Sequence, residues 1–254
     1  MIMKKVLSLA LCMLVAFALV GCSSQSNGKK ELLIGVSPDY PPYESLNTKN
    51  EMEGFDIDMT KELIKIMNKN GGNYTYKWKQ MSFDTLRGAV QSNQIDLAIS
   101  GFTRHKEWDV IWSHKYNSSK QVALVKAGSS IKKNSDLNGK KIGAQLAATG
   151  ETVANDIKKK APSTTVKTSK DAKVLVEMIK SNGLDAVILD EAVAKNYVKN
   201  NKTLEMVNDE ALLNEENLII ANKNSKDLIN KVNKAVDEFI KSKKYTELKN
   251  KWGC

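Results

Sequence analysis

The sequence predicts an α/β fold made of two similar lobes that are joined by two hinge strands. Two helix–strand units follow one pattern, at 82–99 and again at 169–189: an amphipathic helix leads through Ser-Asn into an apolar strand that opens with Ile-Asp or Leu-Asp. Two extended segments, 121–125 and 218–221, bracket the second unit, as expected if the chain leaves the first lobe and later returns to it. The pattern therefore favours two lobes over one continuous sheet.

The amino-terminal residues have the pattern of a bacterial export signal. Lys4 and Lys5 precede an apolar run that is too short for a confident membrane span. The run ends in Leu-Val-Gly-Cys at Cys22, which resembles the lipobox of bacterial lipoproteins. We expect 1–21 to be a signal peptide, Cys22 to be lipidated and 22–30 to be a flexible tether on the outer side of the cell membrane. The alternative is an ordinary secretory signal with an incidental cysteine.

The first lobe is predicted from five elements in order. A buried strand at 32–36 stops at a proline-containing loop, and a helix at 56–68 carries apolar residues on one face. Alternation of aromatic residues at 74–78 indicates another strand. Ser82 is placed to cap a second helix, and the apolar run 95–99 follows as a buried strand.

The second lobe repeats this arrangement. It starts at a strand near 139–143, continues through a helix at 149–160, and reaches a second helix that Ser169 is placed to cap. The strand 184–189 follows, and an amphipathic helix at 226–240 lies beyond the return segment. The predicted boundaries are 31–124 with 217–254 for the first lobe and 125–216 for the second.

The charge pattern excludes a nucleic-acid-binding surface. The formal net charge is +10, but the lysines alternate with Asp, Glu and Asn along helical patterns, and Arg87 and Arg104 are the only arginines. We interpret the charge as solvated faces with mild attraction to an anionic membrane.

Cysteine and histidine are too few for several kinds of site. Cys12 lies in the signal, Cys22 is the predicted lipid site and Cys254 ends the chain, so no pair is left for a structural disulfide. His105 and His114 are the only histidines, which leaves little for a zinc site or a Ser-His-Asp triad. We expect no metal, no cofactor and no catalytic residue.

Several short motifs occur in one order between Glu31 and Gly253. They are Tyr-Pro-Pro-Tyr-Glu at 40–44, Gly-Phe-Asp-Ile-Asp-Met at 54–59, Phe-Asp-Thr-Leu at 83–86, the run 95–103, the segments 139–145 and 149–151, Leu-Asp at 189–190 and Lys-Trp-Gly at 251–253. Their order resembles the extracellular solute-binding proteins of family 3, which are amino-acid receptors of ABC importers.

This resemblance implies a type II periplasmic-binding-protein fold with two lobes and two hinge strands. It implies a monomer that captures an amino acid or a related small polar solute in an interlobe cleft, closes about the hinge, and docks on the transmembrane subunits of an ABC permease. Two other functions share the fold: a ligand sensor, and an enzyme similar to cyclohexadienyl dehydratase. Such an enzyme uses carboxylates in the cleft, and no further acid is obvious beyond Asp190 and Glu44, so we expect binding without catalysis.

The resemblance also implies two aromatic walls for the ligand. Tyr40 follows the first strand, where similar proteins place a ring over the ligand; the alternative is packing on Pro41 and Pro42. Phe83, at the start of its helix, resembles the second wall; the alternative is a core residue of that helix.

Polar ligand contacts are expected from residues that follow the strands. Ser100, Gly101 and Thr103 follow a buried strand and offer hydroxyl groups and a close backbone approach to a carboxylate or an ammonium. The alternative is a loop that satisfies its own backbone. Thr149 opens a helix whose amides suit a carboxylate, and it can also be a plain N-cap.

Two further residues are assigned by the resemblance. The family uses an aspartate at the position of Asp190 to bind the α-ammonium of the ligand; the alternative is a helix N-cap. Gln145 occupies a strand end that in similar receptors touches the ligand side chain.

The sequence departs from the family at the arginine that binds the ligand α-carboxylate in Gly-x-Thr-x-Thr-x-x-Arg. Without gaps that position is Trp108; counted back from Trp112, it is Lys106. Arg104 is the first candidate, because a guanidinium suits a carboxylate, and its loss would weaken binding by roughly 2–4 kcal/mol. Otherwise the ligand is not a standard α-amino acid, and Trp108 stacks on an aromatic or cationic ligand.

Overall fold

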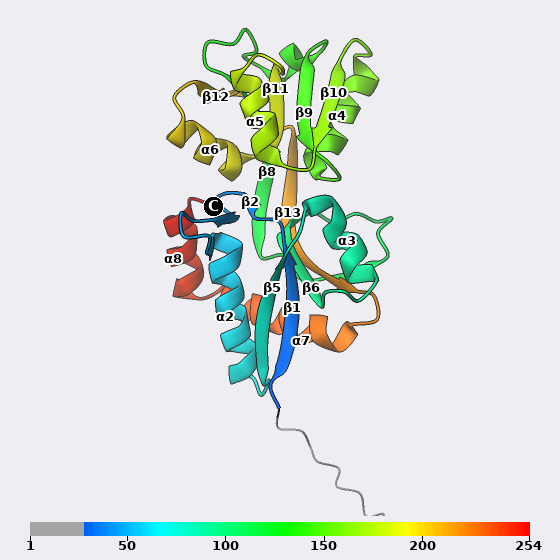
Figure 1. The fold of residues 1–254 in the computed structure, drawn as a ribbon, viewed down its shortest axis with the longest axis vertical. Helices are drawn as coiled ribbons and strands as arrows, with labels where there is room; N and C mark the ends of the chain where they lie inside the picture. The colour runs from blue at the N-terminus through cyan, green and yellow to red at the C-terminus, as the bar shows by residue number, and fades with distance from the viewer. Residues whose placement is uncertain (1–27) are drawn as a thin grey trace, which may run out of the picture.

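The computed structural model describes residues 28–254, which form two α/β lobes stacked along the long axis of the molecule (Figure 1). The predictions for the signal peptide and for lipidation of Cys22 lie outside the described residues. None of the helices in the described range has both the length and the apolar character needed to cross a bilayer.

The first lobe contains a mostly parallel sheet covered by helices. Its strands are β1 (Lys30–Val36), β5 (Tyr74–Gln80), β6 (Leu97–Phe102) and β7 (Val110–Trp112). Its helices are α2 (Phe55–Lys69), α3 (Phe83–Gln91), α7 (Lys226–Phe239) and α8 (Lys243–Trp252). A separate three-stranded sheet is formed by β2 (Asp39–Tyr40), β3 (Glu44–Leu46) and β4 (Met52–Glu53).

The second lobe has the same kind of architecture. Its strands are β8 (Asn117–Lys126), β9 (Lys141–Gln145), β10 (Thr165–Ser169), β11 (Ala186–Asp190) and β12 (Leu204–Met206), and β13 (Leu213–Asn222) leads back to the first lobe. Its helices are η1 (Asn134–Leu137), α4 (Thr149–Lys160), α5 (Ala172–Lys180) and α6 (Glu191–Asn200). The main strand order is β10-β9-β11-β8-β13-β6-β1-β5.

Two antiparallel strands, β8 and β13, connect the lobes (Figure 1). They pair over 117–121 and 213–217, a few residues before the apolar segments that the sequence analysis selected. The apolar segments lie inside the lobes instead: 122–125 pairs with β11, and 218–221 pairs with β6 and β7. The crossing itself is polar because it borders the space between the lobes.

The helices form where apolar residues recur at helical spacing. In α2, Phe55, Met59, Leu63 and Met67 recur every four residues and are buried against the sheet. Each such side chain stabilises the fold by about 1.5–3 kcal/mol when it leaves water.

One predicted helix cap is wrong, and another makes no side-chain bond. Ser169 ends β10, and α5 is capped by Asp171, whose carboxylate accepts from the Lys173 amide at 2.7 Å. The physical reason is that the chain turns after Ser169, whose hydroxyl accepts from the Asp171 amide at 3.2 Å. Ser82 does occupy the N-cap position of α3, but its side chain makes no capping hydrogen bond.

Candidate functional site

A small polar cavity lies where the two lobes meet. Its free volume is about 20 Å³, enough for about one water molecule. Its lining comes from both lobes: Asp39, Tyr40, Glu44, Phe83, Ser100, Gly101, Gln121, Gln145, Ala148, Thr149 and Asp190. Most of these residues lie at strand ends or helix starts, where α/β proteins gather polar groups around ligands. A solute the size of an amino acid therefore enters only when the lobes separate.

Asp190 is the centre of the hydrogen-bond network at this cavity. It is 4 % exposed, and its carboxylate accepts from Tyr40 Oη at 3.3 Å, from Ser119 Oγ at 2.9 Å and from Gln121 Nε2. Its amide donates to Tyr40 Oη at 3.1 Å. Burial, together with the negative charge of Glu215, raises the pKa of Asp190 well above its ordinary value. Asp190 stands at the N-cap position of α6, but its side chain does not cap that helix.

Gln121 links Asp190 to a second buried carboxyl group. Its Nε2 donates both to Asp190 and, at 2.6 Å, to Oε1 of Glu215. Thr103 Oγ1 donates to the other oxygen of Glu215 at 2.6 Å. Thr103 thus lies behind the cavity and does not line it. The Oε1 atom of Gln121 is buried and has no hydrogen-bond donor within the described chain.

A second carboxyl pair, Glu44 with Asp56, lies on the first-lobe side. Ser100 Oγ donates to Glu44 Oε1 at 2.6 Å, and Tyr116 Oη donates to Asp56 Oδ2 at 2.9 Å. Gly101, at a φ of 61°, directs its amide to the same Asp56 oxygen at 3.3 Å. Burial raises the pKa of Asp56 to about 7, and burial with the charge of Asp56 raises the pKa of Glu44 well above its ordinary value. Burial therefore favours the protonated form of both members of this pair.

Direct bonds join the lobes at the cavity rim. Asp39 accepts from Gln145 Nε2 at 2.8 Å and from the Ala172 amide at 3.1 Å. The ion pair between Lys170 and Asp84, at 3.3 Å, connects the lobes nearby. Burial raises the pKa of Asp39, although its hydrogen bonds oppose this.

Aromatic rings form part of the cavity wall. Tyr40 stacks on Tyr43 with ring centroids 6.4 Å apart, and its hydroxyl reaches Asp190 of the other lobe. Phe83 stacks on Phe102 at 4.9 Å. Phe83 therefore both packs against the core and lines the cavity.

The amino end of α4 forms the opposite wall. Ala148 is the N-cap of α4 and Thr149 is its first residue, and both line the cavity. Gly150 allows this close approach, because a Cβ atom there would lie 2.8 Å from the carbonyl oxygen of Ile188.

The loop that carries the arginine candidates lies outside the cavity. The Arg104 guanidinium is exposed and lies over the Trp112 ring, 5.6 Å from its centroid, and Lys106 is also exposed. Trp108 stacks on Trp112 and on His105, at 5.7 and 4.5 Å. The contacts of Arg104, Lys106 and Trp108 with a ligand stay predictions.

The structure thus brings seven of the nine predicted ligand-binding residues to one cavity and leaves Thr103 and Arg104 outside its lining. The sequence analysis missed Asp39, Gln121 and Ala148, and it missed Glu215 behind them. Two of these, Gln121 and Glu215, lie on β8 and β13. The signal that could have identified them is the polar runs at 117–121 and 214–217, each followed directly by an apolar segment.

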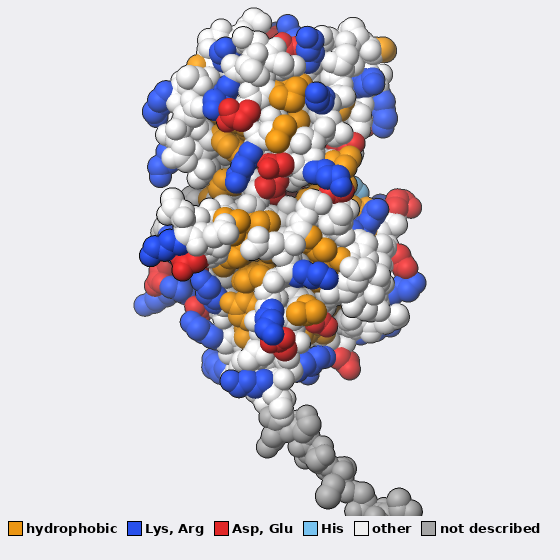
Figure 2. All heavy atoms as spheres, viewed as in Figure 1, with side chains coloured by type: hydrophobic (Ala, Val, Ile, Leu, Met, Phe, Trp, Pro, Cys, Tyr) orange, Lys and Arg blue, Asp and Glu red, His pale blue; other side chains and the backbone are white. Residues whose placement is uncertain are grey.

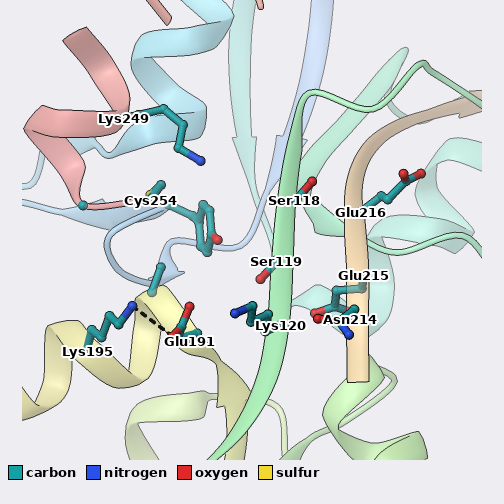
Figure 3. Close-up of a pocket in the computed structure, with 13 residues that line it drawn as sticks. Ser118, Ser119, Lys120, Glu191, Lys195, Asn214, Glu215, Glu216, Lys249 and Cys254 are labelled. Carbon is teal, nitrogen blue, oxygen red and sulfur yellow. Dashed lines mark ion pairs between the residues drawn. The ribbon is translucent and has the colours of Figure 1, made fainter. Parts of the chain in front are cut away.

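A larger groove opens beside the hinge strands (Figure 3). Its volume is about 620 Å³. Figure 3 shows its charged residues, which come from β8, β13, α6 and α8: Lys120, Glu191, Lys195, Glu215, Glu216 and Lys249. Glu191 and Lys195 form an ion pair at 3.0 Å. A similar mixture of lysines and acids is interspersed over the face of the molecule that Figure 2 shows.

Comparisons with known proteins give one consistent result. The family model described as bacterial extracellular solute-binding proteins, family 3, matches residues 32–254. The arginine-binding extracellular protein ArtP of Bacillus subtilis is 34% identical over 98% of both chains, and the ABC transporter glutamine-binding protein GlnH of the same species is 29% identical over 98% of this chain and 97% of its own.

Solved structures agree with these relatives. The crystal structure of the arginine-, lysine-, histidine-binding protein ArtJ from Geobacillus stearothermophilus is 35% identical and has a TM-score of 0.80, over 88% of this chain and 95% of its own. The predicted two-lobed fold is confirmed.

Proposed function

Because the chain belongs to the bacterial extracellular solute-binding proteins of family 3, we propose that it captures an amino acid or a related small polar solute in the interlobe cavity and delivers it to an ABC permease. The observation that carries this proposal is the lining of the cavity, whose polar groups come from both lobes. A solute that touches both lobes stabilises the closed arrangement over the open one.

Closure is proposed to occur about β8 and β13. In the closed arrangement Tyr40 bonds to Asp190, and Asp39 bonds to Gln145, across the cleft. A bound solute replaces part of these contacts, because the cavity is too small for both. The affinity then reflects solute contacts minus the interlobe contacts that are lost.

Roles for the lining residues follow from their chemistry. Tyr40 and Phe83 offer ring faces, Asp190 offers a carboxylate for an ammonium group, and Gln145 offers an amide to the solute side chain. If the solute is an α-amino acid, Arg104 or Lys106 must turn toward the cleft to meet its carboxylate.

A thermal-shift screen tests the proposal. Twenty amino acids, simple amines and short peptides are added in turn to the purified protein, and a bound solute raises the melting temperature by favouring the native state. We expect at least one compound to raise the melting temperature. The same compound should be recovered chemically unchanged, because the protein is expected to bind without catalysis. A panel without any shift would contradict the proposed function.

Anchoring is a separate part of the proposal. The motif at Cys22 supports a lipid-anchored monomer outside the cell membrane, where the closed form can dock on the permease. Metabolic labelling with a fatty acid should mark the wild type and should not mark Cys22→Ala. Persistent labelling of the variant would contradict lipidation at this residue.

A further inference from the structure

The cavity is lined by carboxyl groups without a cationic side chain. Asp39, Glu44 and Asp190 line it, with Asp56 and Glu215 directly behind, and none of the Lys, Arg or His residues between 28 and 254 contributes to its lining. An α-amino acid carries a carboxylate as well as an ammonium. Its carboxylate would enter a desolvated site among like charges, which is costly.

The two arginines lie over aromatic rings outside the cavity lining, and Lys106 is exposed to solvent. Arg104 lies over Trp112, and Arg87 lies over Trp108 at 4.8 Å. The rim cation Lys170 is paired with Asp84. In this closed arrangement no basic side chain of residues 28–254 lines the cavity to neutralise a carboxylate there.

Gln121 gives a second, independent indication, namely that the ligand donates N–H groups at this cavity. It is 3 % exposed and lines the cavity, and its amide nitrogen is used by Asp190 and Glu215. Its carbonyl oxygen lacks a donor in the described chain. A buried acceptor without a donor costs free energy, and a ligand that carries N–H groups removes that cost.

The amino end of α4 acts in the opposite direction, because helix amino ends attract anions. The Glu151 carboxylate already lies in the first turn of α4 and accepts from the Ala147 amide at 2.7 Å. The unpartnered Gln121 oxygen lies beside this turn, 3.2 Å from where a Cβ atom on Gly150 would be. A ligand carboxylate there would face this oxygen and Asp190.

A cation suits the two carboxyl pairs. Without a nearby positive charge, burial and a neighbouring carboxyl group raise the pKa of both Asp190 and Glu44. An ammonium or guanidinium beside these two groups would favour their ionised forms, with a charge-assisted hydrogen bond to each.

We propose that the cleft selects an organic cation, a primary amine or a guanidinium, that carries no carboxylate. This inference rests on the proposed function, because it takes the interlobe cavity as the solute site. It specifies the chemical class of the solute and removes the need for the family's arginine.

Matched pairs of compounds test the inference by isothermal titration of the purified protein. Agmatine is compared with arginine, and cadaverine with lysine; each pair differs only by the carboxylate. We expect the amine to bind at least about tenfold more tightly than its amino acid, because a like charge in a desolvated site costs several kcal/mol. Equal or tighter binding of the amino acids would overturn the inference and leave the proposed function intact. If no compound in the full screen binds, the proposed function itself fails.

Arg104→Ala distinguishes the two ligand classes further. A carboxylate-free cation does not use Arg104, so the affinity for agmatine should change less than about twofold, as for an exposed side chain. A tenfold or greater loss would show that the arginine turns into the cleft, and would overturn the inference. Circular dichroism and melting temperature confirm that the variant is folded.

Discussion

The interlobe cavity and the hinge-side groove both use residues of strand β8 but differ in how their charges are balanced. The cavity has about 20 Å³ of free volume and, among the described residues, is lined by carboxyl groups without lysines. The groove has about 620 Å³ and is lined by three lysines as well as acids. Neighbouring residues separate the two environments: Asp190 faces the cavity and Glu191 faces the groove. The comparison teaches that burial, more than residue type, determines what a carboxylate can do here.

The largest expected effect comes from substituting this neighbouring pair. Asp190→Asn should weaken binding of the best compound by roughly 2–4 kcal/mol, the range for removing one partner of a buried charged hydrogen bond. Glu191→Gln, the matched control, removes an exposed ion pair with Lys195 and should change affinity by less than about 0.5 kcal/mol. Isothermal titration measures both. Similar losses of solute affinity in the two variants would show that Asp190 in the cavity contributes no more to binding than Glu191 in the groove.

The next effect concerns pH and compares two aspartates on α2. Burial raises the pKa of Asp56 from 3.8 to about 7, so the folded state holds more protons than the unfolded state between these values. Its stability contribution therefore falls as pH rises from about 4 to 7. Asp56→Asn should remove this fall and stabilise the protein at pH 8 by up to about 4 kcal/mol, at about 1.4 kcal/mol per pKa unit.

Asp58 is the control for this experiment. Although partial burial opposes it, hydrogen bonds from Lys251, Lys61 and Trp252 lower the pKa of Asp58. Its stabilising effect is therefore present above its unfolded pKa and is lost in acid. Asp58→Asn should destabilise the protein slightly at neutral pH. Urea unfolding at several pH values measures both, and parallel curves for Asp56→Asn and wild type would refute the assignment.

A smaller effect is expected at the rim of the cavity. Gln145→Ala removes the bond to Asp39 across the lobes, worth about 1.5–3 kcal/mol for a hydrogen bond to a charged group. The ligand-free protein should then populate open arrangements more, and its radius of gyration in small-angle scattering should rise. An unchanged radius would show that other contacts suffice for closure.

The smallest effect is expected in the groove. Lys195→Ala breaks only an exposed pair with Glu191, in which the lysine side chain is 54 % exposed, so stability should change by about 0–1 kcal/mol. A larger change in solute affinity than in stability would make the groove part of the binding site.

The sequence alone determined the elements and the general position of the site. Periodicity located α2, α7 and the buried strands, because a helix or strand must place its apolar residues on one side. Strand-end residues such as Tyr40, Thr149 and Asp190 were identified from the family resemblance, and they meet in one cavity.

Only the tertiary structure decided which charges face each other. The pairing of Glu44 with Asp56, and of Asp190 with Glu215, joins residues from different elements, and no local pattern specifies such a pair. The crossing of the hinge strands was likewise displaced from the apolar segments, because a strand that borders a cleft is polar there. Local sequence reports each residue's own preference for water, whereas a site depends on the long-range packing that brings distant residues together and excludes water between them.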